Sequence, residues 1–188
     1  PLGLALQALR SATNEVTVHH GERLVAKAHE AKVGLTTPVA VPYMAALAAS
    51  RGFAGFTQHP FPECFVCGPA RPRGDGLRIF AGPVPAGDTT QPRCVAAPWT
   101  PDPTLAAADG KVAAEFIWAA LDCPGYFAVA ERGETMLLAE ITARVDRRVH
   151  VEEPCVVLGW ALQRDGRRAL AGTALYGRDG GLCAQAQA

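Results

Sequence analysis

The chain has 188 residues, of which 49% are hydrophobic, and its 18 basic and 18 acidic side chains give a formal net charge of zero. This length allows one ordinary domain or two small fused ones, and the apolar content excludes global disorder. The charge balance gives no indication of a nucleic acid or an anionic membrane as partner. Six cysteines fall below the density of a disulfide scaffold, so we expect reduced thiols in a cytoplasmic protein.

The first 32 residues resemble the end of the chain. Residues 24–28 follow a turn at residues 20–22, and residues 182–186 follow a turn at residues 179–181, with identical residues at three of the five positions. The pattern predicts an internal repeat in which residues 1–32 are the last strands of a first copy. Because the chain begins at Pro1, we expect the natural N-terminus, with the helix of that copy, to lie upstream.

Residues 33–62 read as a connector before a second unit at residues 63–188. An alanine-rich helix is predicted at residues 41–50, where Pro42 fits only the first turn. A loop rich in proline and glycine follows at residues 59–76, and residues 77–80 read as a strand. No signal peptide is evident at the start, and Glu115 and Asp122 interrupt the longest apolar run, so no membrane-spanning helix is predicted.

The loop contains a CxxC motif, Cys64-Phe65-Val66-Cys67, followed by Gly68. Such a motif is half of a zinc site, a redox pair or a packing element. Zinc normally takes four ligands, no second CxxC or histidine pair follows, and His59 would be only a third ligand. A thioredoxin-type pair starts a helix, whereas prolines favour a loop here. We favour packing and predict no metal site, with metal and redox roles as alternatives.

Three arginines surround the turn at residues 73–76. Arg71, Arg73 and Arg78 lie close enough in sequence to meet the phosphates of coenzyme A together. The alternative is a solvated turn. We name Arg73 and Arg78 as predicted substrate-binding residues.

An apolar, helix-like run at residues 112–129 contains one acid, Asp122, near its middle. Trp118 and Gly125 lie four and three residues away, so burial is expected to raise the pKa of Asp122 and suit it to a general-base role. Pro124 removes a helix hydrogen bond and predicts a kink, whose free amides can hold an oxyanion. The alternative is an Asp that caps the segment or pairs with an arginine. Glu115 is interpreted as a helix-dipole residue.

Four strands are predicted after this helix, at residues 137–145, 155–163, 169–176 and 182–188, joined as a meander. Residues 137–145 alternate with period two, which indicates a strand. Asp165-Gly166 and Asp179-Gly180 are hairpin turns. Glu140 and Thr142 share one strand face and are predicted to work with Asp122 if that face meets the helix, or to be ordinary surface residues if it meets solvent.

Other catalytic classes find little support. The chain has no G-x-S-x-G elbow, no dinucleotide-binding glycine motif and no Walker loop. No cofactor is expected.

The order of loop, strand, buried helix and long-stranded meander resembles the hotdog fold, an α+β fold in which an antiparallel sheet wraps a central helix. The motif at Cys64–Gly68, the Gly76-Leu77 step and the helix segment from Trp118 to Asp122 look like hotdog thioesterase-like domains. The whole is similar to a double-hotdog protein of the acyl-CoA thioesterase II type, or to actinobacterial relatives without assigned activity. The resemblance implies a tandem hotdog with an incomplete first copy.

The resemblance also implies a catalytic Asp122, with substrate held by Trp118, Cys123, Gly125 and Tyr126. The chain departs from these domains in two places. First, Val112-Ala113-Ala114-Glu115 stands where many small hotdog thioesterases have His-Gly-Gly. Second, Leu138 and Ala188 fall where the thioesterase II type has a threonine and a glutamine, with Thr142 and Gln187 close by.

The leading hypothesis is therefore a thioesterase of fatty acid metabolism that hydrolyses an acyl-CoA or acyl-carrier thioester and forms a dimer of double hotdogs. The alternative is a non-catalytic acyl-CoA or lipid-binding protein. A weaker alternative is an enoyl-CoA hydratase or dehydratase. In proteins that resemble this fold, such chemistry usually relies on an Asp–His pair, and no histidine is expected in or beside this helix.

Overall fold

The computed structural model describes residues 5–85, 94–131 and 133–188. The chain divides into two compact units between Lys32 and Val33. Each unit has its own antiparallel sheet. Within the described ranges, none of the helices has the length and apolar character needed to cross a membrane.

The first unit is a three-stranded sheet of β1 (Gln7–Arg10), β2 (Val16–His20) and β3 (Arg23–Ala28), in the order β1-β2-β3. Gly21 adopts a φ of 57° between β2 and β3, the left-handed conformation that glycine accepts readily, so the predicted turn at residues 20–22 is confirmed. The assignment of this first unit as the end of a first hotdog copy stays a prediction.

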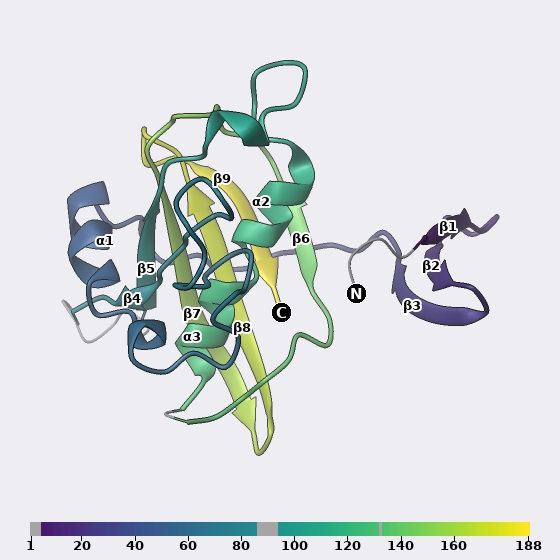
Figure 1. Ribbon diagram of the computed structural model, residues 1–188, viewed down its shortest axis with the longest axis horizontal. Coiled ribbons are helices and arrows are strands. Elements are labelled where there is room, and N and C mark those ends of the chain that lie inside the picture. Colours follow the sequence, from purple (N-terminus) through teal and green to yellow (C-terminus); the bar gives the residue numbers. More distant parts are fainter. Residues whose placement is uncertain (1–4, 86–93, 132) are drawn as a thin grey trace. The chain divides into compact units, whose positions relative to one another are not determined.

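The second unit is built on a six-stranded antiparallel sheet in the order β4-β5-β7-β8-β9-β6 (Figure 1). The strands are β4 (Gly82–Pro83), β5 (Cys94–Trp99), β6 (Thr142–Val145), β7 (Cys155–Asp165), β8 (Arg168–Tyr176) and β9 (Leu182–Gln187). The helices are α1 (Tyr43–Ser50), α2 (Ala114–Ala120) and α3 (Cys123–Val129), with short 3-10 turns at Ala54–Phe56 and Pro103–Leu105.

The meander is confirmed for three strands, β7, β8 and β9, with the turn glycines Gly166 and Gly180 at positive φ. The first predicted strand behaves differently. It forms a ladder only at Thr142–Val145, and it pairs with β9 at the far edge rather than with β7. Leu137 and Leu138 are exposed, so these apolar side chains do not pack on this unit. The segment that contains them is an extended loop.

The two faces of the sheet carry separate cores. Val157, Leu175 and Ala97 belong to the same core as the fully buried Ile117 of α2 and Leu121, which follows α2. Val156, Leu158 and Trp160, on the opposite side of β7 and β8, pack against Ala46 and Ala49 of α1. Because adjacent residues of a strand face opposite sides, the long buried strands serve both layers. The predicted antiparallel sheet around a central helix is confirmed, and a tandem arrangement stays a prediction.

Two glycines bring the central helix close to the sheet. A Cβ atom at Gly159 of β7 would lie 2.3 Å from the Pro124 carbonyl oxygen, and one at Gly125 would lie 3.2 Å from the Ala171 Cβ atom. The helix predicted at residues 112–129 is broken at Leu121 and Asp122, and Pro124 sits in the first turn of α3. The predicted kink is confirmed, because proline fits the start of a helix and not its interior.

The connector folds onto the second unit. Its helix begins at Tyr43 after Pro42, and the Tyr176 hydroxyl donates to the Pro38 carbonyl oxygen. The predicted strand at residues 77–80 was wrong. Leu77 and Ile79 are buried, but their amides donate to the Phe65 and Val66 carbonyl oxygens, each at 2.8 Å, so this segment pairs with the CxxC loop.

Candidate functional site

The break between α2 and α3 places Asp122 at the inner face of the sheet. The buried Thr173 hydroxyl of β8 donates to the Leu121 carbonyl oxygen at 2.7 Å. This bond satisfies a carbonyl that the end of α2 leaves without a helical partner. The backbone around Asp122 is therefore fixed by the sheet beneath it.

The Asp122 carboxylate is half-buried, and in the described ranges no hydrogen bond or ion pair reaches it. Burial raises the pKa of Asp122 above its ordinary value, and the negative charge of the Cys64 thiolate adds to the shift. A capping role and an arginine pair, the two structural alternatives, are both absent in this part of the molecule. A half-buried carboxylate without a partner costs stability, which is the usual mark of a group kept for chemistry or binding.

The break offers few amide donors. Pro124 has no N–H, and the Gly125 amide donates to the Asp122 carbonyl oxygen at 3.1 Å. Oxyanion binding by amides of the kink, expected from the sequence, therefore stays a prediction and rests on the Cys123 amide.

The CxxC loop meets the helix break. The Cys64 and Cys123 sulfur atoms are 3.6 Å apart, and the three sulfur atoms of Cys64, Cys67 and Cys123 all lie within 4.8 Å of one another. His59 Nε2 lies 3.3 Å from the Cys67 sulfur. From the sequence, Cys123 was expected only to bind substrate, because no pattern in the sequence links it to Cys64, 59 residues earlier.

The cysteines differ in acidity. Hydrogen bonds from the Cys123 and Cys67 thiols lower the pKa of Cys64 far below its ordinary value, against the effect of burial, and the Cys67 and Val66 amides lower it further. The Cys123 thiol has a raised pKa, because it is held in those hydrogen bonds to Cys64 and Cys67 and because it is buried. The directions of these shifts make Cys64 the most acidic thiol of the cluster.

His59 corrects one expectation. We expected no histidine beside the central helix, but the His59 ring centroid lies 5.6 Å from that of Phe127 in α3. Burial lowers the pKa of His59, although the charge of Cys64 opposes the shift. Its Nδ1 atom accepts the Phe61 amide at 2.9 Å. The neutral ring therefore carries its proton on Nε2 and donates it to the Cys67 sulfur.

A cavity of about 410 Å³ lies beside α3. Tyr126, four residues after Asp122, lines it, and its hydroxyl donates to the Glu134 carbonyl oxygen at 2.7 Å. The opposite wall comes from the segment that leads into the CxxC loop, including Thr57 and His59. The volume is in the range of small-molecule sites.

The other predicted binding residues lie on the surface. Trp118 is 41% exposed on α2. Arg73 is exposed in the turn, whereas the Arg78 guanidinium donates to the Arg71 carbonyl oxygen at 2.6 Å and stacks on Phe80. Arg78 is thus partly used by its own loop. A joint phosphate site of Arg73 and Arg78 stays a prediction.

Glu140 and Thr142 are not joined to Asp122 by any hydrogen bond in the described ranges. Glu140 is exposed in the loop before β6, and Thr142 is half-buried on β6. Ile141 and Ala143 pack against the core that contains Ile117, so by alternation the other face of this segment is turned away from it. A catalytic role for this pair stays a prediction.

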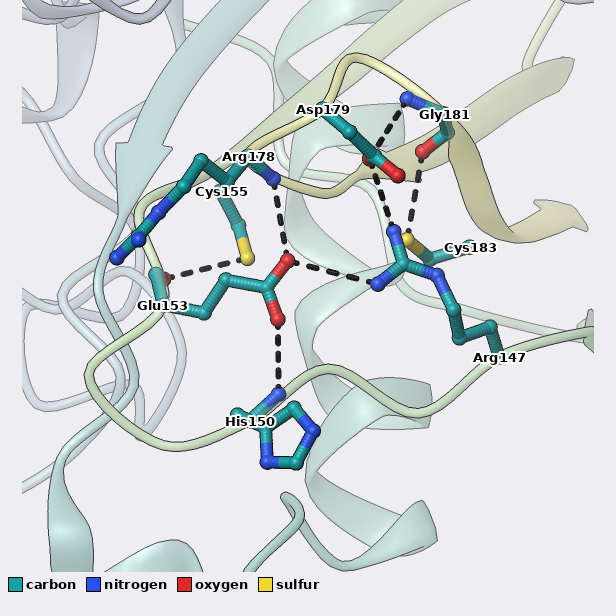
Figure 2. Close-up of polar contacts among 8 residues, drawn as sticks. All are labelled: Arg147, His150, Glu153, Cys155, Arg178, Asp179, Gly181 and Cys183. Carbon is teal, nitrogen blue, oxygen red and sulfur yellow. Dashed lines mark hydrogen bonds and ion pairs between the residues drawn. The ribbon is translucent and has the colours of Figure 1, made fainter.

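A second polar cluster surrounds Arg147 and Glu153 (Figure 2). Arg147 lies 3.0 Å from Asp179 and 3.6 Å from Glu153. Glu153 also accepts the amides of His150 and Arg178, at 3.0 and 3.1 Å. These contacts surround a cavity of about 530 Å³. The ion pairs of Arg147 with Glu153 and Asp179 hold the loop before β7 to the β8–β9 turn.

Known proteins resemble this chain in structure only. No protein-family model and no curated protein matches the sequence. A solved thioesterase superfamily protein is 22% identical with a TM-score of 0.46, over 50% of this chain and 46% of that chain. Zebra fish thioesterase superfamily member 2 is 16% identical with a TM-score of 0.48, over 57% and 77%. A hypothetical thioesterase protein from Streptococcus pneumoniae, solved with coenzyme A, is 8% identical with a TM-score of 0.46, over 50% and 76%.

This chain thus spans less than half of the first of these proteins. Solved proteins described as thioesterase superfamily members are thus among those to which part of this chain is similar in structure.

Proposed function

We propose that this chain is a thioesterase-like hydrolase that cleaves an acyl thioester, with coenzyme A as the carrier to test first. The observation that supports the proposal best is the Asp122 carboxylate. It is half-buried at a helix break, and no partner reaches it in the described chain. Keeping this carboxylate half-buried and unpaired lowers the stability of the folded state.

In the proposed reaction, Asp122 accepts a proton from a water molecule while the water oxygen attacks the thioester carbonyl carbon. A carbon–oxygen bond forms, the carbon–sulfur bond breaks, and the thiolate leaves with the electron pair of that bond. Asp122 then gives its proton to the leaving sulfur, so the products are a carboxylic acid and a free thiol and the Asp122 carboxylate is regenerated. A positioned base of this kind contributes roughly 10²–10⁴-fold to a rate.

The acyl group is proposed to enter the cavity beside α3. Tyr126 lines that cavity one helical turn beyond Asp122, which is itself not among the lining residues, so the thioester carbonyl would have to reach from the cavity toward the break. Cys123 and Gly125 lie between these two residues in the sequence, and the exposed Trp118 is one turn before them. The carrier would then extend across the surface toward Trp118 and Arg73.

A thiol-release assay tests the proposal. Full-length protein is incubated with acyl-CoA substrates from short to long, and we expect Asp122→Asn to lower the release rate by roughly 10²–10⁴-fold. The matched control is Glu115→Gln, the same acid-to-amide change at an exposed position on α2. The control is expected to retain the wild-type rate, and an equal loss in both variants would contradict a specific role for Asp122.

A binding protein that lacks turnover is the second possibility, and the occupied Gly125 amide favours it. Tight acyl-CoA binding without thiol release, unchanged in Asp122→Asn, would establish it and overturn the hydrolase. Thr142→Ala and Glu140→Gln test the predicted helpers of Asp122, since loss of turnover with unchanged binding would assign them a catalytic role.

A further inference from the structure

We propose that Cys64, Cys67 and Cys123 bind one zinc ion at the break between α2 and α3. Cys64 and Cys67 come from the CxxC loop, and Cys123 is the first residue of α3. The inference concerns a metal site and does not depend on the proposed hydrolysis.

The distances fit zinc bound by thiolates. Zinc takes sulfur ligands at about 2.3 Å in a tetrahedral arrangement, which places neighbouring sulfur atoms about 3.8 Å apart. The Cys64 and Cys123 sulfur atoms are 3.6 Å apart, and no pair in the cluster exceeds 4.8 Å. In the part of the chain that the structure describes, this is the one group of three potential metal ligands found so close together.

The ligands stand on fixed backbone. The CxxC turn is closed by a hydrogen bond from the Gly68 amide to the Cys64 carbonyl oxygen at 2.8 Å, and a Cβ atom at Gly68 would lie 2.5 Å from the Cys64 nitrogen. Leu77 and Ile79 pair with the middle of the loop, as described above. Cys123 is held by the contact of α3 with the sheet. Ligands on rigid elements lose little freedom when a metal binds.

A hydrogen-bond donor lies beside the sulfur atoms. The His59 ring donates to the Cys67 sulfur at 3.3 Å. Three thiolates around a divalent ion leave one net negative charge, which such a donor stabilises. Because its Nδ1 atom accepts the Phe61 amide, His59 is a positioning residue and not a ligand. The fourth ligand of the zinc ion is therefore proposed to be a nitrogen or oxygen atom that comes from none of these three cysteines.

A redox pair explains less of the arrangement. A dithiol pair uses two sulfur atoms, whereas three gather here around one point. Redox CxxC motifs start a helix, whose N-terminus stabilises the thiolate, but this motif lies in a turn. A metal ion uses all three thiols and also explains the donor that faces them.

Metal content tests the site. Full-length protein is purified under reducing conditions, its zinc is counted by mass spectrometry, and its zinc absorption spectrum gives the ligands. We expect one zinc per chain with three sulfur ligands at about 2.3 Å and one lighter ligand. Absence of zinc after reconstitution, or a disulfide between Cys64 and Cys123 in protein handled without oxygen, would overturn the proposal.

Variants test the ligand set. Cobalt replaces zinc in the Cys123→Ser variant and in the matched control Cys94→Ser, a half-buried cysteine of β5 outside the cluster. The control is expected to keep the thiolate-to-cobalt absorption and the rise in melting temperature with zinc. Cys123→Ser is expected to lose both while its circular dichroism spectrum stays native. Retention of both signals in Cys123→Ser would overturn its role as a ligand.

His59→Ala tests the positioning role. We expect one zinc still to bind with three sulfur ligands, and the affinity, measured by competition with a chelator, to fall roughly 10–100-fold. An unchanged affinity would remove His59 from the site.

Discussion

The two polar regions of the second unit treat their acidic groups in opposite ways. Glu153 accepts two backbone amides and lies beside Arg147, which also contacts Asp179 (Figure 2). Asp122 is half-buried, as Glu153 is, but no described group pairs with its carboxylate. The pKa of Glu153 is lowered, because the two amides and Arg147 outweigh the effect of burial, whereas the pKa of Asp122 is raised.

This contrast separates structure from chemistry. Glu153 stabilises the fold because each of its partners favours the ionised form. Asp122 is positioned by its backbone alone, through the Thr173 hydroxyl and the close contact of α3 with Gly159. The comparison predicts that changes at Glu153 alter stability, whereas changes at Asp122 alter activity.

The largest effect on stability is expected from Gly159→Ala. The new Cβ atom would lie 2.3 Å from the Pro124 carbonyl oxygen and 2.6 Å from its carbon, so α3 must move away from the sheet. Overpacking of this kind costs about 1–3 kcal/mol of the free energy of unfolding, measurable by urea denaturation. Gly34→Ala, where a Cβ atom meets nothing within 4 Å, is the control. Equal stability of the two variants would show that α3 is not fixed by this contact.

Glu153→Gln is expected to cost about 1–3 kcal/mol, because hydrogen bonds to a charged acceptor are lost. Asp122→Asn removes no described hydrogen bond, so its free energy of unfolding is expected to change by less than about 0.5 kcal/mol or to rise. Chemical denaturation of both variants checks the pair. The comparison fails if Asp122→Asn is the more destabilised protein.

Acid sharpens the same contrast. The folded pKa of Glu153 lies below its ordinary value of 4.5, so its ionised form stabilises the fold at higher pH. That contribution is lost as the pH falls through the lowered folded pKa. The stability gap between wild type and Glu153→Gln should therefore be constant above about pH 5.5 and shrink toward acid. Denaturation between pH 7 and pH 3 measures this gap, and a gap that grows toward acid would refute the pairing.

The smallest effect is expected at the surface pair Arg71–Asp75, which is 2.7 Å apart with the Asp75 side chain 54% exposed. Exposed ion pairs contribute about 0.2–1 kcal/mol. Asp75→Asn should lower stability within that range, and the loss should disappear in high salt. A loss of stability as large as that of Glu153→Gln would contradict the distinction between a half-buried, paired acid and an exposed one.

Local patterns predicted much of the fold. The turn glycines Gly166 and Gly180 marked the hairpins of β7, β8 and β9, and Pro124 marked the break before α3. The place of β6 beside β9 could not be predicted in this way, because it depends on which edge the chain reaches after residue 146. Residues 77–80 were interpreted as a strand, but they pair with the CxxC loop. The segment that they meet also could not be predicted from their own sequence.

The candidate site was predicted in part. Asp122 stood out as an acid within an apolar run, and its half-burial follows from its neighbours. The meeting of Cys123 with Cys64 and the contact of His59 with Phe127 are long-range packing, which spacing in one sequence does not report. Glu140 and Thr142 were chosen from strand alternation, which identifies a face but not what that face meets.

The strand order also has a consequence for how the chain folds. Cys94 of β5 pairs with Trp160 of β7, and Thr142 of β6 pairs with Gln187 of β9, so the strands on both sides of the β7–β8–β9 meander join it over long stretches of chain. Closing long loops costs entropy before the contacts repay it, and sheets with such pairings fold in milliseconds to seconds. We expect the β7–β8–β9 hairpins to form first and the two edge ladders last, so the sheet edges are the surfaces most exposed to mispairing in the nascent protein.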